Sequence, residues 1–280
     1  MLAAVGLFSL MDAGLKLLAA HYPPLQVSAL RGASSLPLVL AWALWSVGPR
    51  PLLRVRWPLH LLRGALGVLM MGSFVYALQR MPLSTAYSIF FVAPLLITAL
   101  SVPILRERVG PRRWSAIAVG LLGVLVVLRP SGEGVFTWAG LAVLVAAFGY
   151  AVSAITVRVL ARTDSTQAIT FWLLALMALG AGALALPDWV PLRAQDAWLI
   201  GGIGIAGALG QYAITEAFRL GEASQIAPLE YTALLWGVGL DLALWGVLPD
   251  GVTWLGAGII IASGLYLLRR ERVHASAEHP

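Results

Sequence analysis

The sequence of 280 residues contains no cysteine, a single lysine and few charged residues of any kind. The absence of cysteine excludes disulfide bonds, thiolate metal sites and a cysteine nucleophile. Charged residues make up 11% of the chain and hydrophobic residues 60%, so most of the backbone must be surrounded by lipid or by other helices rather than by water. The composition therefore predicts a polytopic membrane protein with no room for a soluble domain.

The formal charge of +6 does not indicate a nucleic-acid partner, because the arginines are scattered at predicted helix ends and form no single patch with interleaved aromatics. The chain enters apolar sequence at Leu2 with no basic segment ahead of it. We therefore interpret the start as a first membrane crossing and not as a cleavable signal peptide.

Ten apolar runs, separated by glycine, proline and charge, are long enough to cross about 30 Å of hydrocarbon. The expected crossings are residues 2–20, 25–47, 59–79, 83–103, 112–129, 137–160, 167–186, 197–218, 223–247 and 252–268. Fourteen arginines flank one set of loops, namely Arg50, Arg54, Arg56, Arg63, Arg106, Arg108, Arg112, Arg113, Arg158, Arg162, Arg219, Arg269, Arg270 and Arg272. Only Arg80, Arg129 and Arg193 flank the other set. Because basic loops stay in the cytoplasm, we expect both termini inside, in a multi-pass protein of the inner (plasma) membrane.

The two halves resemble each other at a spacing close to 140 residues. The matching pairs are Lys16 with Arg158, Gln26 with Gln167, Arg80 with Arg219, and Trp114 with Trp254. Each unit has five crossings, an odd number, so the second must start on the opposite side of the membrane and the repeats are inverted. We expect a first repeat over residues 1–134, a second over 135–272, and a short polar tail over 273–280. Such halves place a site near the midplane and permit alternating access.

The stretch from Arg80 to Trp114 combines small and apolar residues with a helical proline, Pro94, a glutamate, Glu107, and a basic turn. Together with the segments from His21 to Gly32 and from Ser224 to Arg270, it resembles the drug/metabolite transporter superfamily, specifically its ten-helix (EamA-type) branch. Bacterial members of that branch include amino-acid and metabolite exporters. The resemblance implies an all-α fold of ten transmembrane helices and the transport of a small organic solute, without specifying the solute.

One position departs from the family pattern. Many relatives repeat the glutamate near the end of the ninth helix, where this chain has Gly246, with Asp241 earlier. A role that requires two symmetric glutamates is therefore not expected here.

Ionisable side chains within apolar runs usually face a cavity, a partner or a functional path. Asp12 lies about 16 Å along the first helix, close to the midplane, and Lys16 follows at i+4 on the same face. Two interpretations stay open: a self-neutralised structural pair, or a site for substrate or protons.

The eighth and ninth crossings carry further polar groups. Glu216 has the spacing to pair with Arg219, whereas Gln211 and Tyr212 are cavity candidates. Glu230 and Asp241 lie 11 residues apart in the numbering, about 20° apart around a helix, and so share a face. We favour Glu230, because Asp241 falls near the outer boundary where water can reach it.

Residues on several of the expected crossings are candidates for lining a substrate cavity. They are Asp12, Lys16, Tyr87, Phe91, Pro94, Tyr150, Ser153, Gln211, Tyr212, Glu230 and Trp236. The candidates for proton coupling are Asp12, Glu216 and Glu230. Arg31 is interpreted as a structural anchor near the outer surface.

These features predict a secondary transporter that exports small organic solutes, first of all neutral or aromatic amino acids, by alternating access. Export or import of another metabolite or a drug is the alternative. An intramembrane enzyme is disfavoured because all four histidines lie at or beyond predicted helix ends and no HExxH motif occurs, so we expect no metal and no cofactor. A channel would need a polar stripe through several helices. The expected partners are the solute and membrane lipid; a monomer is compatible with the design, and the oligomeric state is left open.

Overall fold

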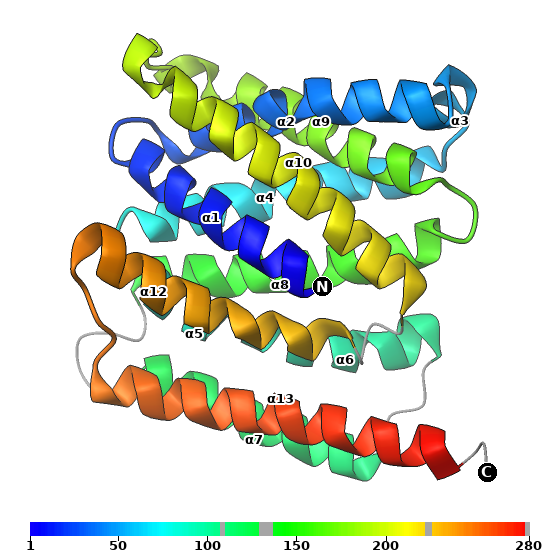
Figure 1. Ribbon diagram of the computed structural model, residues 1–280, viewed down its shortest axis with the longest axis vertical. Coiled ribbons are helices and arrows are strands. Elements are labelled where there is room, and N and C mark those ends of the chain that lie inside the picture. The colour runs from blue at the N-terminus through cyan, green and yellow to red at the C-terminus, as the bar shows by residue number, and fades with distance from the viewer. Residues whose placement is uncertain (107–109, 129–136, 222–225, 278–280) are drawn as a thin grey trace.

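The computed structural model describes residues 1–106, 110–128, 137–221 and 226–277, and every regular element in these ranges is helical (Figure 1). The long helices are α1 (Leu2–Ala19), α2 (Pro24–Ser46), α4 (Trp57–Leu78), α7 (Pro111–Leu128), α8 (Trp138–Leu160), α9 (Thr166–Ala185), α10 (Ala197–Leu220) and α13 (Gly251–Ala277). The shorter elements are α3 (Pro49–Leu53), α5 (Leu83–Phe90), α6 (Val92–Leu105), η1 (Leu186–Asp188), η2 (Ala194–Asp196), η3 (Ala227–Thr232) and α12 (Ala233–Trp245). Glu107, Arg108 and Arg129, singled out in the sequence, lie outside the described residues.

Helical segments occupy each of the ten predicted apolar runs. Within the described ranges, seven are long and apolar enough to cross a membrane, one of them the combined α5 and α6 from Leu83 to Leu105. The last helix extends beyond its predicted end at residue 268 as far as Ala277, so the described part of the expected polar tail is helical.

Two of the predicted runs are interrupted, each next to a proline. The fourth run divides into α5 and α6 at Phe91. The ring of Pro94 would clash with the carbonyl group of Phe90 in a continuous helix, and Pro94 has no backbone N–H to donate to that carbonyl. In the ninth run, the 3₁₀ helix η3 begins at Ala227, directly before Pro228, and the chain becomes α-helical again at Ala233. Both interruptions bring irregular backbone to the middle of the molecule, where protein surrounds it.

The helices pack in layers (Figure 1). α2 packs against α9, α4 against α8, α1 against α10, α5 against α12, and α7 against α13. The pair α7 and α13 lies side by side at one edge, and α2 and α9 lie at the opposite edge. Helices α1, α4, α8 and α10 fill the centre, and side chains of these four helices line the main cavity.

Close packing in the centre depends on small residues. A Cβ atom at Gly204 of α10 would lie 2.6 Å from the Ser34 carbonyl oxygen of α2, and one at Gly32 would lie 2.9 Å from the Leu174 carbonyl oxygen of α9. Such distances leave no space for any side chain. Glycine therefore sets how closely α2 approaches its two neighbours, as is usual between helices in lipid.

The turn between α8 and α9 is held by Asp164. Its carboxylate accepts hydrogen bonds from the Arg56 backbone N–H (3.1 Å), from Nε2 of His60 (2.8 Å) and from the Thr163 hydroxyl (2.6 Å). Burial raises the pKa of Asp164, but the hydrogen bonds from Thr163, His60 and Arg56 outweigh it, so the net pKa lies below its ordinary value.

Replacing Gly204 by alanine is expected to destabilise the protein by about 1–3 kcal/mol, because the new methyl group must displace the backbone of α2. Gly202, on the same helix, has nothing within 4 Å of its Cβ position and is the matched control. Gly202→Ala should leave stability unchanged or raise it by up to about 1 kcal/mol. Thermal unfolding in detergent measures both, and equal shifts for the two variants would contradict the packing argument.

Asp164→Asn should lower stability by about 1.5–3 kcal/mol at pH 7, because hydrogen bonds to a charged carboxylate are lost. A depressed pKa in the folded state stabilises the protein above the unfolded value of about 3.9 and ceases to do so as the pH falls through the folded value. The difference in unfolding temperature between wild type and variant should therefore shrink below about pH 4. A difference that is constant from pH 7 to pH 3 would show that the charge is not involved.

Candidate functional site

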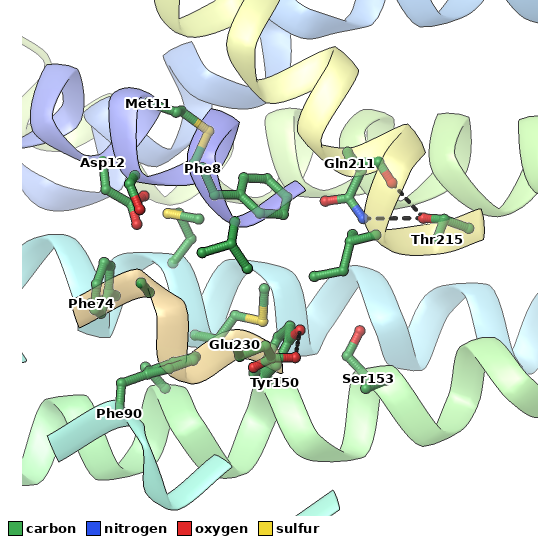
Figure 2. Close-up of a pocket in the computed structure, with 18 of the residues that line it drawn as sticks. Phe8, Met11, Asp12, Phe74, Phe90, Tyr150, Ser153, Gln211, Thr215 and Glu230 are labelled. Atoms are coloured by element: carbon green, nitrogen blue, oxygen red, sulfur yellow. Dashed lines mark hydrogen bonds between the residues drawn. The ribbon is translucent and has the colours of Figure 1, made fainter. Parts of the chain in front are cut away.

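A cavity of about 150 Å³ lies between the central helices. Figure 2 shows its walls, to which α1, α4, α5, α8, α10 and η3 all contribute. Most of the lining is apolar, and its aromatic residues are Phe8, Phe74, Tyr87, Phe90, Phe91, Tyr150 and Phe218. Its ionisable residues, tyrosines aside, are Asp12, Arg31, Arg63 and Glu230.

Each carboxylate in the cavity is bound by a tyrosine from another helix. The Tyr87 hydroxyl of α5 donates to Oδ2 of Asp12 on α1 (2.8 Å), and the Tyr150 hydroxyl of α8 donates to Oε1 of Glu230 on η3 (2.7 Å; Figure 2). Both acids are buried, with 8% of their surface exposed. These two hydrogen bonds tie four separate elements together at the cavity wall.

A row of aromatic rings connects the two tyrosines. Tyr87 stacks on Phe74 with centroids 6.3 Å apart, Phe74 meets Phe90 edge to face at 5.6 Å, and Phe90 lies 5.4 Å from Tyr150. We call these four rings the aromatic wall. It runs between the Asp12 end and the Glu230 end of the cavity, giving an apolar surface with an acid at each end.

The opposite side of the cavity carries neutral polar groups. Nε2 of Gln211 donates to the Thr215 hydroxyl at 3.4 Å within α10 (Figure 2). The Ser153 hydroxyl of α8 accepts a hydrogen bond from Nε of Arg63 at 3.3 Å. Of the residues selected from the sequence, the structure thus brings together Asp12, Tyr87, Phe91, Tyr150, Ser153, Gln211 and Glu230.

Two arginines that were not predicted to face the cavity line it. Arg63 was assigned to a cytoplasmic flank, but α4 begins at Trp57, so nearly two turns precede Arg63 and its side chain is 2% exposed. Arg31 was interpreted as a surface anchor and is also 2% exposed. The sequence feature that could have indicated this burial is that each arginine lies in the second turn of its helix, Arg31 in α2 and Arg63 in α4, and not in a loop.

Of the two interpretations left open for Asp12 and Lys16, the self-neutralised pair is not the one that forms. Nζ of Lys16 lies 3.6 Å from Oδ1 of Asp241 and donates to the Met81 carbonyl oxygen at 3.1 Å, outside the cavity lining. The i+4 rule describes neighbours on one helix, whereas here contacts with α5 and α12 decide where each side chain goes.

Asp241 was expected to be hydrated near the outer boundary, but it is fully buried. Its carboxylate accepts hydrogen bonds from the backbone N–H groups of Leu83 (3.1 Å) and Ser84 (2.7 Å) and from the Ser84 hydroxyl (2.6 Å). It therefore satisfies free donors at the start of α5, where a negative charge is also favoured by the helix dipole. Because η3 interrupts the ninth run, Asp241 does not share a continuous helix face with Glu230.

Four other selected residues lie outside the cavity lining. Tyr212 is 43% exposed and contacts Trp42, since adjacent residues on a helix point about 100° apart and Gln211 takes the inward direction. Trp236 is 45% exposed and packs against Gly6. Glu216 forms an ion pair with Arg219 at 2.9 Å, as the spacing predicted. Pro94 is buried in α6, where it ends α5 without facing the cavity.

A model of the EamA-like transporter family matches residues 1–129 and again residues 137–269. The chain belongs to this family. It is thus a drug/metabolite transporter and a multi-pass protein of the inner membrane. The description of the family and the names of the similar proteins given below indicate a transporter rather than an enzyme.

Three curated proteins are similar to this chain over most of its length. A riboflavin transporter of Vibrio cholerae is 32% identical over 89% of this chain and 84% of its own length. A pseudopaline exporter of Pseudomonas aeruginosa is 28% identical over 95% and 93%, and an S-adenosylmethionine uptake transporter of Rickettsia prowazekii is 28% identical over 79% and 74%. A solved crystal structure shares the fold, with a TM-score of 0.69, 22% identity and coverage of 96% and 98%.

Asp241→Ala is expected to destabilise the protein by about 3–5 kcal/mol, because it leaves the Lys16 ammonium without its partner at a mostly buried position. The double variant Lys16→Met/Asp241→Ala should cost less than the sum of the two single changes, by about 0.5–3 kcal/mol. Thermal unfolding of the four proteins gives this coupling directly. Strictly additive costs would mean that the pair contributes nothing.

Proposed function

We propose that the chain is a secondary transporter that exports small organic solutes, with neutral or aromatic amino acids as the leading class, by alternating access. The observation that carries the proposal is the central cavity, which combines two buried carboxylates, two buried arginines and an aromatic wall. A zwitterion with an apolar side chain presents matching groups: an ammonium, a carboxylate and a hydrophobic surface.

The polar groups suit an ammonium. Asp12 and Glu230 each have one carboxylate oxygen bound by a tyrosine and a second oxygen for which no hydrogen bond is found among the described residues. An ammonium needs such acceptors when it leaves water, and aromatic faces also attract cations. These two acids are also our candidates for carrying a proton; Glu216, held by Arg219 outside the cavity, is not part of this proposal.

The size of the cavity favours a compact solute. An apolar cavity of about 150 Å³ accommodates a benzene-sized ring in another protein. The volume found here is therefore close to that of one aromatic side chain. A larger solute would require the surrounding helices to move apart.

We also propose ten crossings arranged as inverted repeats over residues 1–134 and 135–272, with both termini in the cytoplasm. Two observations support the division into two related halves. The family model matches the chain twice, and the first match ends near the proposed boundary. The packing is also consistent with a pseudo-two-fold axis that relates α1 to α8, α2 to α9, and α4 to α10. Under this relation the contact of α1 with α10 corresponds to that of α8 with α4, and the contact of α2 with α10 corresponds to that of α9 with α4. All four contacts are present.

The relatives support both the proposal and one alternative. The pseudopaline exporter aligns over nearly the whole chain and supports export as the direction. The riboflavin transporter of Vibrio cholerae and the aromatic wall support a second candidate, a neutral heteroaromatic solute similar to riboflavin. Such a solute would use the wall without needing the charged groups.

In liposomes, the purified protein should move phenylalanine, tryptophan or leucine in a saturable manner. Asp12→Asn and Glu230→Gln should reduce that flux at least about tenfold, because each removes a buried negative charge that the ammonium needs. Glu216→Gln, which removes a carboxylate outside the cavity, is the matched control and should retain wild-type flux. Wild-type flux in both cavity variants would refute the assignment of the site.

The same liposomes distinguish the solute classes. Transport of riboflavin with no transport of any amino acid would replace the leading class by the second candidate. Repeating the measurement with an imposed pH gradient tests proton coupling, since a coupled carrier accumulates solute against its gradient and loses this ability in the Asp12 or Glu230 variant.

A further inference from the structure

Arg31 is a buried cation that contacts no carboxylate, although the buried Asp12 of the same cavity attracts it electrostatically. Its side chain is 2% exposed within α2 and lines the central cavity. No ion pair joins it to an aspartate or glutamate of the described residues. A charge removed from water is costly unless it is paired and hydrogen-bonded, so an unpaired guanidinium here calls for an explanation.

The protein satisfies Arg31 only in part. Nη2 donates to Oε1 of Gln211 at 3.4 Å and Nη1 approaches Sδ of Met177 at 3.7 Å, which are long contacts with weak acceptors. Nε has no hydrogen-bond partner among the residues that the structure describes. The Phe8 ring, whose centroid lies 5.8 Å from Cζ, adds a modest cation–π attraction.

Two other cations, the buried Arg63 of α4 and the mostly buried Lys16 of α1, are better satisfied. Arg63 donates from Nη1 to the Ile169 carbonyl oxygen at 2.9 Å and from Nε to Ser153, which fixes α4 against α8 and α9. Lys16 has Asp241 and the Met81 carbonyl. Among the described residues, Arg31 therefore differs from Lys16 in having no carboxylate partner, and from Arg63 in having a buried Nε without a hydrogen-bond partner.

We propose that Arg31 binds the carboxylate of the transported solute, with Nε and Nη2 as the two donors. These two atoms lie on one edge of the planar guanidinium and match the two oxygens of a carboxylate. This assignment rests on the proposed function and makes it more specific: the solute must carry a carboxylate, which riboflavin lacks. Asp12 lines the same cavity from α1 and is the acceptor for the ammonium at the other end of the zwitterion.

Binding of three related probes to the purified, full-length protein tests the assignment by calorimetry. L-Phenylalanine carries both charged groups, 3-phenylpropionate lacks the ammonium, and phenethylamine lacks the carboxylate. Wild type should bind phenylalanine about 10- to 100-fold more tightly than phenethylamine, the usual effect of hydrogen bonds to a charged group. In Arg31→Gln this ratio should fall to about 1. Arg31→Lys keeps the positive charge but lacks the two parallel N–H donors of the guanidinium, so it should give an intermediate ratio.

The ratio of affinities is the decisive readout, because a partial loss of folded protein lowers the number of binding sites for all probes equally and leaves this ratio unchanged. Arg80→Gln is the matched control: Arg80 is exposed and bonded to the Tyr76 carbonyl, so removing it changes the net charge without touching the cavity. This control should keep the wild-type ratio.

The outcomes separate this assignment from the proposed function. If wild type binds 3-phenylpropionate but not phenylalanine, and Arg31→Gln loses that binding, the amino-acid class is wrong and the role of Arg31 stands. If phenylalanine is bound and Arg31→Gln keeps the wild-type ratio, the role of Arg31 is wrong and the amino-acid class stands. A wild-type protein with no preference for any carboxylate-bearing probe also overturns the assignment.

Discussion

The requirement that shapes this molecule is that lipid offers no hydrogen bonds, so a polar group within a membrane-spanning helix is costly unless the protein or a bound solute supplies a partner. The central acids meet it through tyrosines, with Tyr87 serving Asp12 and Tyr150 serving Glu230. Asp241 meets it with the backbone at the start of α5. Each solution joins elements that are distant in sequence, so satisfying the polar groups also holds the helices in place.

The positions of the helices could be predicted from the sequence because span length and apolar composition are local properties. The proline breaks were likewise foreseeable, although Pro94 acts on the backbone at Phe91 rather than facing the cavity. What the sequence could not provide is the direction in which each helix turns its side chains. For this reason Tyr212 was expected in the cavity but faces outward.

The errors with charged residues have a common physical origin. Rules for pairs on one helix treat it as isolated, whereas contacts between helices decide the partner of Lys16 and the burial of Arg63. Arg63 fell near the start of the predicted crossing 59–79 and was therefore assigned to the loop flank, whereas α4 begins at Trp57 and carries Arg63 in its second turn. The pair of Glu216 and Arg219, near the end of α10 and partly exposed, followed the local rule because little else competes there.

The aromatic wall has a consequence for the entropy of binding. Each of its four rings has only two side-chain torsions, and all four pack against one another, so they have little rotational freedom left to lose. A solute that docks on such a surface orders few protein side chains, and the shape of the surface exists before the solute arrives. Selection at the wall therefore depends on how well the solute fits a fixed outline, and flat rings that can lie against it are favoured over flexible chains.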